Sequence, residues 1–201
     1  AWNGQVTEVV RMLLESKADV TLRDYTFRYK KKPEWTWTGG PLHLACVQPE
    51  SSEVAEMLLD MKAEVNEYTK CKGSTVTMLL HLHVAAGSDN AAVVQLLVEE
   101  GAVVGQKSRQ RNKNGEETDH FTALHEAAYF GNLASTQALL EARADPNATD
   151  MYCHTPMHVL VRACDQTCDG KFAKVAKALL ESRADLTLQD NVGTCLQVAT
   201  L

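Results

Sequence analysis

One phrase of eight residues recurs along this chain and constrains its fold more than any other feature. Each copy opens on a leucine pair, and four of the five copies close on alanine and an acidic residue. The copies are LLESKADV at residues 13–20, LLDMKAEV at 58–65, LLVEEGAV at 96–103, LLEARADP at 139–146 and LLESRADL at 179–186. Their first leucines lie 45, 38, 43 and 40 residues apart. Self-similarity at such a period predicts a fold assembled from stacked copies of one small unit.

A second phrase precedes the four later copies and predicts a short helix. It reads GPLHLAC at 40–46, LHVAA at 82–86, TALHEAA at 122–128 and TPMHVLV at 155–161, and TCLQVA at 194–199 begins a further copy. A threonine such as Thr155 can cap a helix, and a proline after it suits the first helical turn, where no amide donor is needed. Leucines and small alanines follow, so this helix should pack closely on its neighbours. A longer helix with apolar residues at three- and four-residue spacing should follow it, for example at 53–61 and 91–99.

The longer helix should end in a left-handed residue just before the closing alanine. Glycine is the favoured residue there, and only one copy has it. The five positions are Lys17, Lys62, Gly101, Arg143 and Arg183. The left-handed backbone conformation destabilises a Lys or Arg residue by roughly 1 kcal/mol. The attraction between its positive charge and the negative end of the helix dipole offsets about 0.3–1 kcal/mol of this strain. We therefore predict positive φ angles at all five.

A unit of short helix, tight link, longer helix and extended link resembles the ankyrin repeat. The resemblance rests on Thr155-Pro156-Met157-His158 and its counterparts at 40–43 and 122–125, together with the Leu-Leu-Glu-x-x-Ala-Asp close, and it covers essentially the whole chain. It implies an all-α repeat solenoid, with helix-turn-helix units joined by β-hairpin-like loops. The approximate units are 1–39, 40–74, 75–121, 122–154, 155–193 and 194–201, in a single array.

The mean spacing of 41.5 residues exceeds the ankyrin period of about 33 and matches armadillo and HEAT repeats. Insertions into an ankyrin-like unit, at 23–38, 105–121, 165–171 and 48–52, account for the additional length. The all-helical armadillo and HEAT repeats also lack the Thr-Pro and Ala-Asp motifs, which favours the ankyrin interpretation. The first and last units are incomplete, so we expect residues 1–201 to be a segment of a longer repeat array or of a larger protein.

The resemblance implies that the short helices line a concave palm on which protein partners bind. The palm positions are Trp2, Val47, Gly87, Tyr129 and Arg162, with Phe130 next to Tyr129. Trp, Tyr and Arg are typical of interface hot spots. The alternative is that Trp2 and Phe130 pack against a neighbouring longer helix.

The insertion at 23–38 combines basic and aromatic residues. Arg28, Lys30, Lys31 and Lys32 stand among aromatics that include Trp35 and Trp37. The two-residue period of the aromatics predicts a half-exposed strand pair that turns near Lys32-Pro33. The insertion at 105–121 is also basic and carries the turn dipeptide Asn114-Gly115.

Together the two insertions would form a basic rim that attracts an acidic protein segment. Single-stranded nucleic acid is a weaker alternative because the chain carries a net charge of −6 and has a pI near 5.6. In the third interpretation the lysines only belong to a solvent-exposed turn, and the aromatic residues pack against the stacked helices.

Four histidines, His43, His83, His125 and His158, share one repeat position. The resemblance implies a structural role, in which the imidazole hydrogen-bonds across the loop and to the adjacent unit. Equivalent placement argues against a catalytic role for any one of them.

The sequence contains no Gly-x-Ser-x-Gly nucleophile elbow, no Walker phosphate-binding loop, no Gly-x-Gly-x-x-Gly dinucleotide-binding turn and no His-Glu-x-x-His metalloprotease motif. We therefore expect that residues 1–201 form no enzyme and bind no cofactor. Cys153, His154, His158, Cys164 and Cys168 have zinc-like spacing, but His158 already has a repeat role. Six scattered cysteines suggest reduced thiols in a cytoplasmic protein. No apolar run approaches the 18–20 or so residues needed to span a bilayer, and no small-molecule substrate is expected.

We therefore expect a non-catalytic protein-interaction scaffold. The second hypothesis is a recruitment or regulatory segment of a larger enzyme or channel whose chemistry lies outside this chain. The third is a redox or zinc sensor at residues 153–168.

Overall fold

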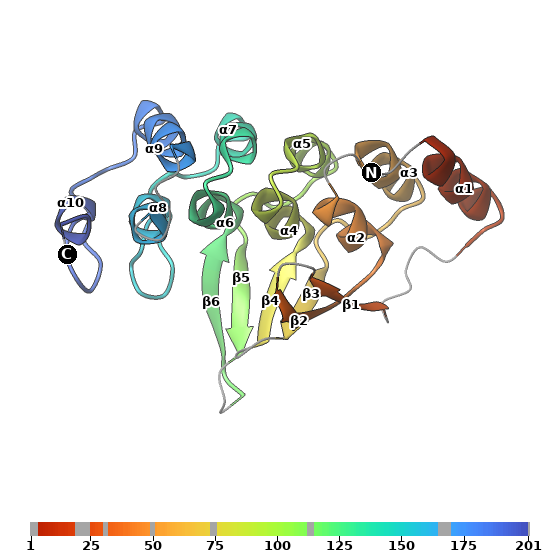
Figure 1. Cartoon of the computed structure of the whole chain (residues 1–201), viewed down its shortest axis with the longest axis horizontal. Helices are drawn as coiled ribbons and strands as arrows, with labels where there is room; N and C mark the ends of the chain where they lie inside the picture. Colours follow the sequence, from red (N-terminus) through yellow and green to blue (C-terminus); the bar gives the residue numbers. More distant parts are fainter. Residues whose placement is uncertain are drawn as a thin grey trace.

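Two rows of helices run the length of the molecule, and a β-sheet projects from one of them. The computed structural model describes residues 4–18, 25–29, 32–48, 51–72, 76–111, 115–164 and 170–200. The inner row contains α2 (Pro41–Val47), α4 (His81–Gly87), α6 (Ala123–Phe130), α8 (Pro156–Cys164) and α10 (Cys195–Val198). The outer row contains α1 (Gly4–Glu15), α3 (Ser52–Asp60), α5 (Ala91–Glu99), α7 (Leu133–Glu141) and α9 (Lys171–Glu181). Within each row successive helices contact one another in chain order, so the units stack as predicted (Figure 1).

The outer helices end in the left-handed residues that the sequence predicts. The angle φ is 60° at Lys17, 66° at Lys62, 88° at Gly101, 63° at Arg143 and 68° at Arg183. In each case the amide of the following alanine bonds a carbonyl five residues back, as Ala144 N does to Leu139 O at 2.9 Å. In the third unit that carbonyl belongs to Leu97, so Leu97 and not Leu96 is the true first leucine of the phrase.

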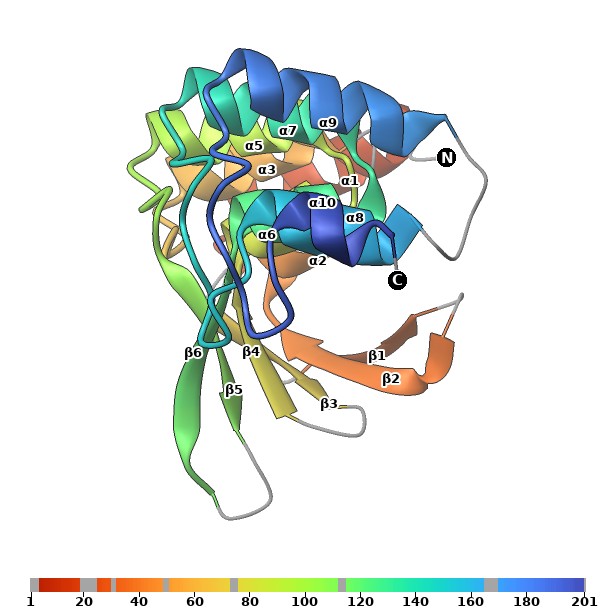
Figure 2. The same ribbon diagram turned by 90° about the vertical axis from the view of Figure 1, so that its left-hand side faces the viewer.

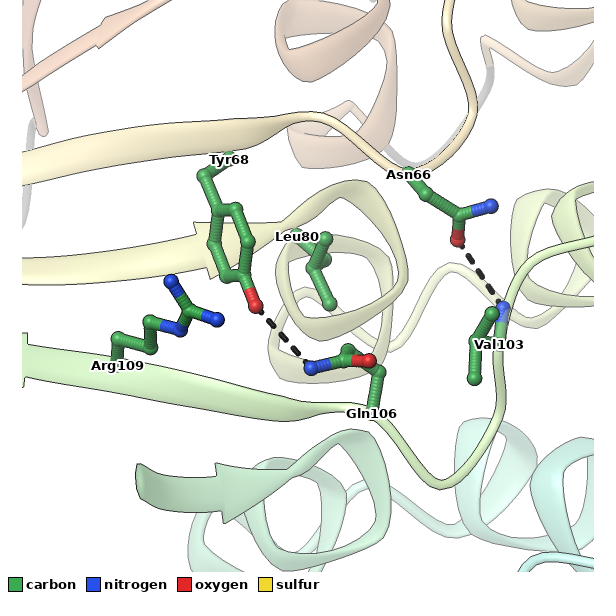
Figure 3. Close-up of a pocket in the computed structure, with 6 residues that line it drawn as sticks. All are labelled: Asn66, Tyr68, Leu80, Val103, Gln106 and Arg109. Atoms are coloured by element: carbon green, nitrogen blue, oxygen red, sulfur yellow. Dashed lines mark hydrogen bonds between the residues drawn. The ribbon is translucent and has the colours of Figure 1, made fainter. Parts of the chain in front are cut away.

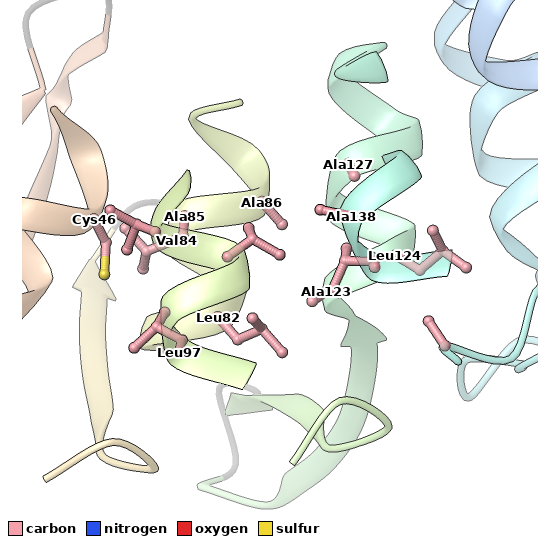
Figure 4. Close-up of a cluster of buried hydrophobic side chains, with 14 of the residues drawn as sticks. Cys46, Leu82, Val84, Ala85, Ala86, Leu97, Ala123, Leu124, Ala127 and Ala138 are labelled. Atoms are coloured by element: carbon pink, nitrogen blue, oxygen red, sulfur yellow. The ribbon is translucent and has the colours of Figure 1, made fainter. Parts of the chain in front are cut away.

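The leucines and alanines of the two helical phrases form one continuous core. Figure 4 shows this packing around α4 and α6, where Leu82, Leu97 and Leu124 are buried beside Ala86 and Ala127. Small residues let adjacent inner helices approach closely, and each fully buried leucine contributes about 1.5–3 kcal/mol.

The links between units form β-hairpins that are longer than the resemblance implies. The strands are β1 (Tyr25–Tyr29), β2 (Lys32–Gly39), β3 (Tyr68–Lys72), β4 (Val76–Leu80), β5 (Lys107–Arg111) and β6 (Glu117–Thr122). They pair antiparallel in chain order and form one six-stranded sheet. We call this element the finger sheet. Figure 2 shows it on the opposite side of the inner helices from the outer row.

The helical array agrees with the predicted fold class, and the finger sheet adds to it. Neighbouring helices pack about 8–10 Å apart, and two strands span about 9.6 Å across a sheet. Hairpins from successive units therefore meet at hydrogen-bonding distance, as β2 and β3 do through Trp37 and Cys71.

The predicted strand pair in the first insertion is confirmed, but its turn is earlier than predicted. Tyr29 pairs with Lys32, so Lys32 and Pro33 already belong to β2. The resemblance implies a hairpin-like link between the second and third units, but the strands β3 and β4 themselves were not identified from the sequence.

Candidate binding surface

The palm positions lie along the inner row. Val47, Gly87 and Tyr129 occupy the last turns of α2, α4 and α6, and Arg162 lies in the last turn of α8. Trp2 lies outside the described residues. The predicted positions on successive inner helices are therefore adjacent in space.

Among the described residues of this row, Tyr129 and Phe130 are exposed aromatic residues. The ring centroids of Tyr129 and Phe130 lie 5.0 Å apart in an edge-to-face arrangement. The Phe130 ring also covers Gly87, where a Cβ would come within 3.4 Å of it. Phe130 therefore contacts the neighbouring inner helix α4.

Arg162 is tied to the next unit by an ion pair. Its Nη2 lies 2.6 Å from Oδ2 of Asp190, a side chain that is fully buried. Burial alone would raise the pKa of Asp190, but the amides of Val192 and Gly193 and the Arg162 guanidinium hold it at about 2. Part of the Arg162 charge is thus already neutralised within the array.

The finger sheet is basic although the chain is acidic. Its six strands contain seven Lys or Arg and three Asp or Glu, a net charge of +4, whereas the whole chain carries −6. Arg28 lies in β1 and Lys32, Trp35 and Trp37 lie in β2, while Lys30 and Lys31 fall outside the described residues. The basic insertion at 105–121 forms β5 and β6 next to β4, so the sheet spans both insertions.

A pocket that the sequence did not predict lies where β3, β4 and β5 leave the helices (Figure 3). It is open to solvent, has a volume of about 190 Å³ and is lined by Asn66, Tyr68, Leu80, Val103, Gln106 and Arg109. The Tyr68 hydroxyl accepts a hydrogen bond from Gln106 Nε2 at 3.2 Å and donates one to the Lys107 carbonyl at 3.3 Å. These bonds hold the Tyr68 ring in place as one wall.

Three of the four repeat histidines connect successive units. The Nε2 atoms of His83, His125 and His158 hydrogen-bond the carbonyls of Phe121, His154 and Gly193 at 2.9, 3.0 and 3.2 Å. Each of these carbonyls stands directly before the residue that caps the next inner helix.

The cap residue decides whether the second ring nitrogen has a partner. Nδ1 of His125 contacts the Thr122 hydroxyl at 2.8 Å, and Nδ1 of His158 contacts the Thr155 hydroxyl at 2.9 Å. Gly40 and Leu80 replace threonine in the two earlier units, and Nδ1 of His83 has no hydrogen-bond partner among the described residues. In His43 both Nδ1 and Nε2 lack such a partner, so the predicted hydrogen bond to the adjacent unit holds for three of the four repeat histidines.

A fifth buried histidine, His81, takes the place of proline in the third unit. Its Nδ1 lies 2.9 Å from the Val65 carbonyl, and its ring centroid lies 3.6 Å from that of His43. Burial lowers the pKa of His81 to about 4, and burial together with the neighbouring His81 lowers the pKa of His43 to about 2. The two rings therefore pack as neutral groups.

The two histidines among the residues with zinc-like spacing have other partners. His154 Nδ1 lies 2.9 Å from Asp150 Oδ2, and His158 bonds within the repeat network as described. Cys153 and Cys164 are exposed free thiols, and Cys168 lies outside the described residues. In the part of the chain that the structure describes, no three His, Cys, Asp or Glu side chains are grouped to hold a metal ion.

Among the described residues no helix combines the length and apolar character needed to cross a membrane. A family model described as ankyrin repeats (3 copies) matches residues 42–150 and 82–190. The transient receptor potential channel pyrexia of Drosophila melanogaster is 30% identical over 153 residues, which are 76% of this chain and 14% of that protein. Ankyrin repeat and SOCS box protein 16 of Homo sapiens is 35% identical over 157 residues, 76% of this chain and 31% of that protein. The chain thus spans less than a third of either relative.

Proposed function

The chain belongs to the ankyrin-repeat family, whose arrays are protein-interaction modules, and we propose that it is a non-catalytic scaffold that binds its partner between the palm and the finger sheet. The observation that carries this proposal is the separation of charge: a sheet of net charge +4 stands on a chain of −6. A partner with an acidic segment would be steered to that sheet. The exposed edge-to-face pair of Tyr129 and Phe130 would supply a nearby aromatic contact.

Charge reversal tests the proposal directly. We expect exchange of Lys30, Lys31 and Lys32 for Glu to weaken capture of the partner and to flatten its salt dependence. A control with Lys174 and Lys177 exchanged for Glu alters exposed lysines on the outer helix α9 and should leave binding unchanged. Equal binding by all three proteins, or a loss confined to the α9 variant, would reject the finger sheet as the partner surface.

We also propose an intracellular site of action. The six cysteines are scattered along the sequence rather than spaced as a disulfide framework, which is typical of reduced thiols in an intracellular protein.

A second candidate function is recruitment or regulation within a larger protein. Both relatives are much longer than the matched segment, and one of them is named as a channel. In that case the array would position a partner for chemistry or transport performed elsewhere. The sequence of the full-length transcript distinguishes this candidate from a free-standing scaffold.

A further inference from the structure

We infer that the pocket between β3, β4 and β5 is a recognition pocket for an acidic peptide, in which one apolar side chain enters the pocket and a nearby carboxylate pairs with Arg109. This inference rests on the proposed function and names the contact point and the chemistry of the partner. Figure 3 shows lining residues from the three strands and from the links that follow α3 and α5.

Val103 departs from the repeat in a way that shapes this pocket. The equivalent residues of the other four units are all acidic: Asp19, Glu64, Asp145 and Asp185. The two aspartates of the later units accept the amide two residues ahead, Asp145 from Asn147 at 2.9 Å and Asp185 from Thr187 at 2.8 Å. Valine cannot form this bond, so the third unit lacks a turn hydrogen bond that those units have.

The replacement leaves an apolar side chain in contact with solvent. Val103 is 53% exposed and lines the pocket with Leu80 and the ring of Tyr68. Its backbone is held in the same way as in the unit that contains Asp185, because Val103 N donates to Asn66 Oδ1 at 3.1 Å as Asp185 N does to Asn147 Oδ1 at 2.7 Å. The local fold is therefore conserved within the chain, while the exposed side chain has changed from anionic to apolar.

Arg109 supplies the complementary charge at the rim. Its guanidinium lies 5.3 Å from the centroid of the Tyr68 ring, and its Nη1 is 3.8 Å from Glu117 Oε2, a long contact for an ion pair. Glu117 is also paired with Arg111. With five N–H donors, Arg109 retains donors for a carboxylate from a partner. An aspartate at position 103 would place a competing anion in the wall of the same pocket.

The size of the pocket indicates what enters it. About 190 Å³ is below the roughly 300–1,000 Å³ of typical small-molecule sites, so a single side chain fits it better than a metabolite. In an extended peptide, residues i and i+2 project to the same side. The expected ligand is therefore a segment with an apolar residue and an Asp or Glu two positions away.

The test is selection of peptides from a random dodecapeptide library displayed on phage against the intact chain. The most enriched synthetic peptide is then measured by fluorescence polarisation. Enriched sequences should share an apolar residue and an acidic residue at that spacing. Val103→Asp should weaken the peptide at least tenfold, and Arg109→Gln at least fivefold.

Asp185→Val is the matched control, because it makes the reverse exchange at the same repeat position in another unit, and it should change binding less than twofold. Val103→Asp should melt at the wild-type temperature or above it, since aspartate restores the turn acceptor. Enrichment of sequences without the pattern, no enrichment, or binding by Val103→Asp within twofold of wild type would overturn the inference. If Val103→Asp binds normally while the Lys30, Lys31 and Lys32 exchange still abolishes partner capture, the proposed function stands and only this pocket assignment fails.

Discussion

The buried histidines make the stability of the array depend steeply on pH. Burial lowers the pKa of His81, His83 and His125 to about 4, and burial with the neighbouring His81 lowers that of His43 to about 2. In the unfolded chain each imidazole titrates near 6.5. Between these values the unfolded state binds more protons than the folded state, so stability must fall as pH falls below about 6.5.

The size of the loss follows from the two pKa values. Between pH 7 and pH 5 a histidine with pKa 4 folded and 6.5 unfolded loses close to 2 kcal/mol of stabilisation. Four such groups give a loss of roughly 7 kcal/mol. Glu126 acts in the opposite direction, because burial raises its pKa to about 7. The Glu126 side chain is partly exposed, so its protonation between pH 7 and pH 5 adds at most about 2 kcal/mol to the stability of the folded chain. A net loss of about 5 kcal/mol is comparable to the whole stability of many domains.

Urea unfolding followed by circular dichroism at 222 nm, at pH 7, 6 and 5, measures this loss. The double variant His83→Gln, His125→Gln should be less stable at pH 7, because it loses two hydrogen bonds between units. Its additional loss between pH 7 and pH 5 should nevertheless be smaller than that of wild type by about 3–4 kcal/mol. A wild-type loss under about 1 kcal/mol, or an undiminished pH dependence in the double variant, would refute the assignment to these histidines.

Three further substitutions test individual contacts by thermal or urea unfolding. Cys153→Gly should stabilise the array by about 0.5–1 kcal/mol, because Cys153 has φ of 63° and glycine relieves the left-handed strain; equal or lower stability would contradict this. Leu124→Ala should cost about 2–5 kcal/mol, whereas Leu196→Ala, at the same repeat position but 75% exposed, should cost well under 1 kcal/mol; similar costs would contradict the described packing. Arg162→Ala should cost about 1–2 kcal/mol, because the Arg162 side chain is partly exposed and Asp190 keeps the hydrogen bonds from the Val192 and Gly193 amides; a change below about 0.5 kcal/mol would show that the pair contributes little.

The helical part of the fold could be predicted because its signals are local and repeated. The left-handed residues at the ends of the outer helices followed from the position of Gly101 and its basic counterparts, and the structure has them at all five. The repeat period also placed the basic insertions on the same side of the stack. The register of the third phrase was wrong by one residue, because Leu96 and Leu97 are both leucines and only the hydrogen bond of Ala102 distinguishes them.

The finger sheet could be predicted only in part, because strand pairing between units is non-local. The alternating aromatics of β1 and β2 predicted one hairpin, whereas the shorter pair β3 and β4 has only a weak alternation in YTKCK and VTMLL. The pocket depends on side chains that are separated by about 40 residues in sequence, such as Tyr68 and Arg109, which only the merged sheet brings together. Its one local signal was the apolar Val103 where the other units have an acidic residue.

Hydrogen exchange measured by mass spectrometry, with and without a saturating bound partner, tests the proposed binding surface most directly. The account predicts new protection in β3–β5, in the turn around Val103 and at the ends of α4 and α6, with no change in the outer helices α5, α7 and α9. Protection confined to those outer helices would contradict the account.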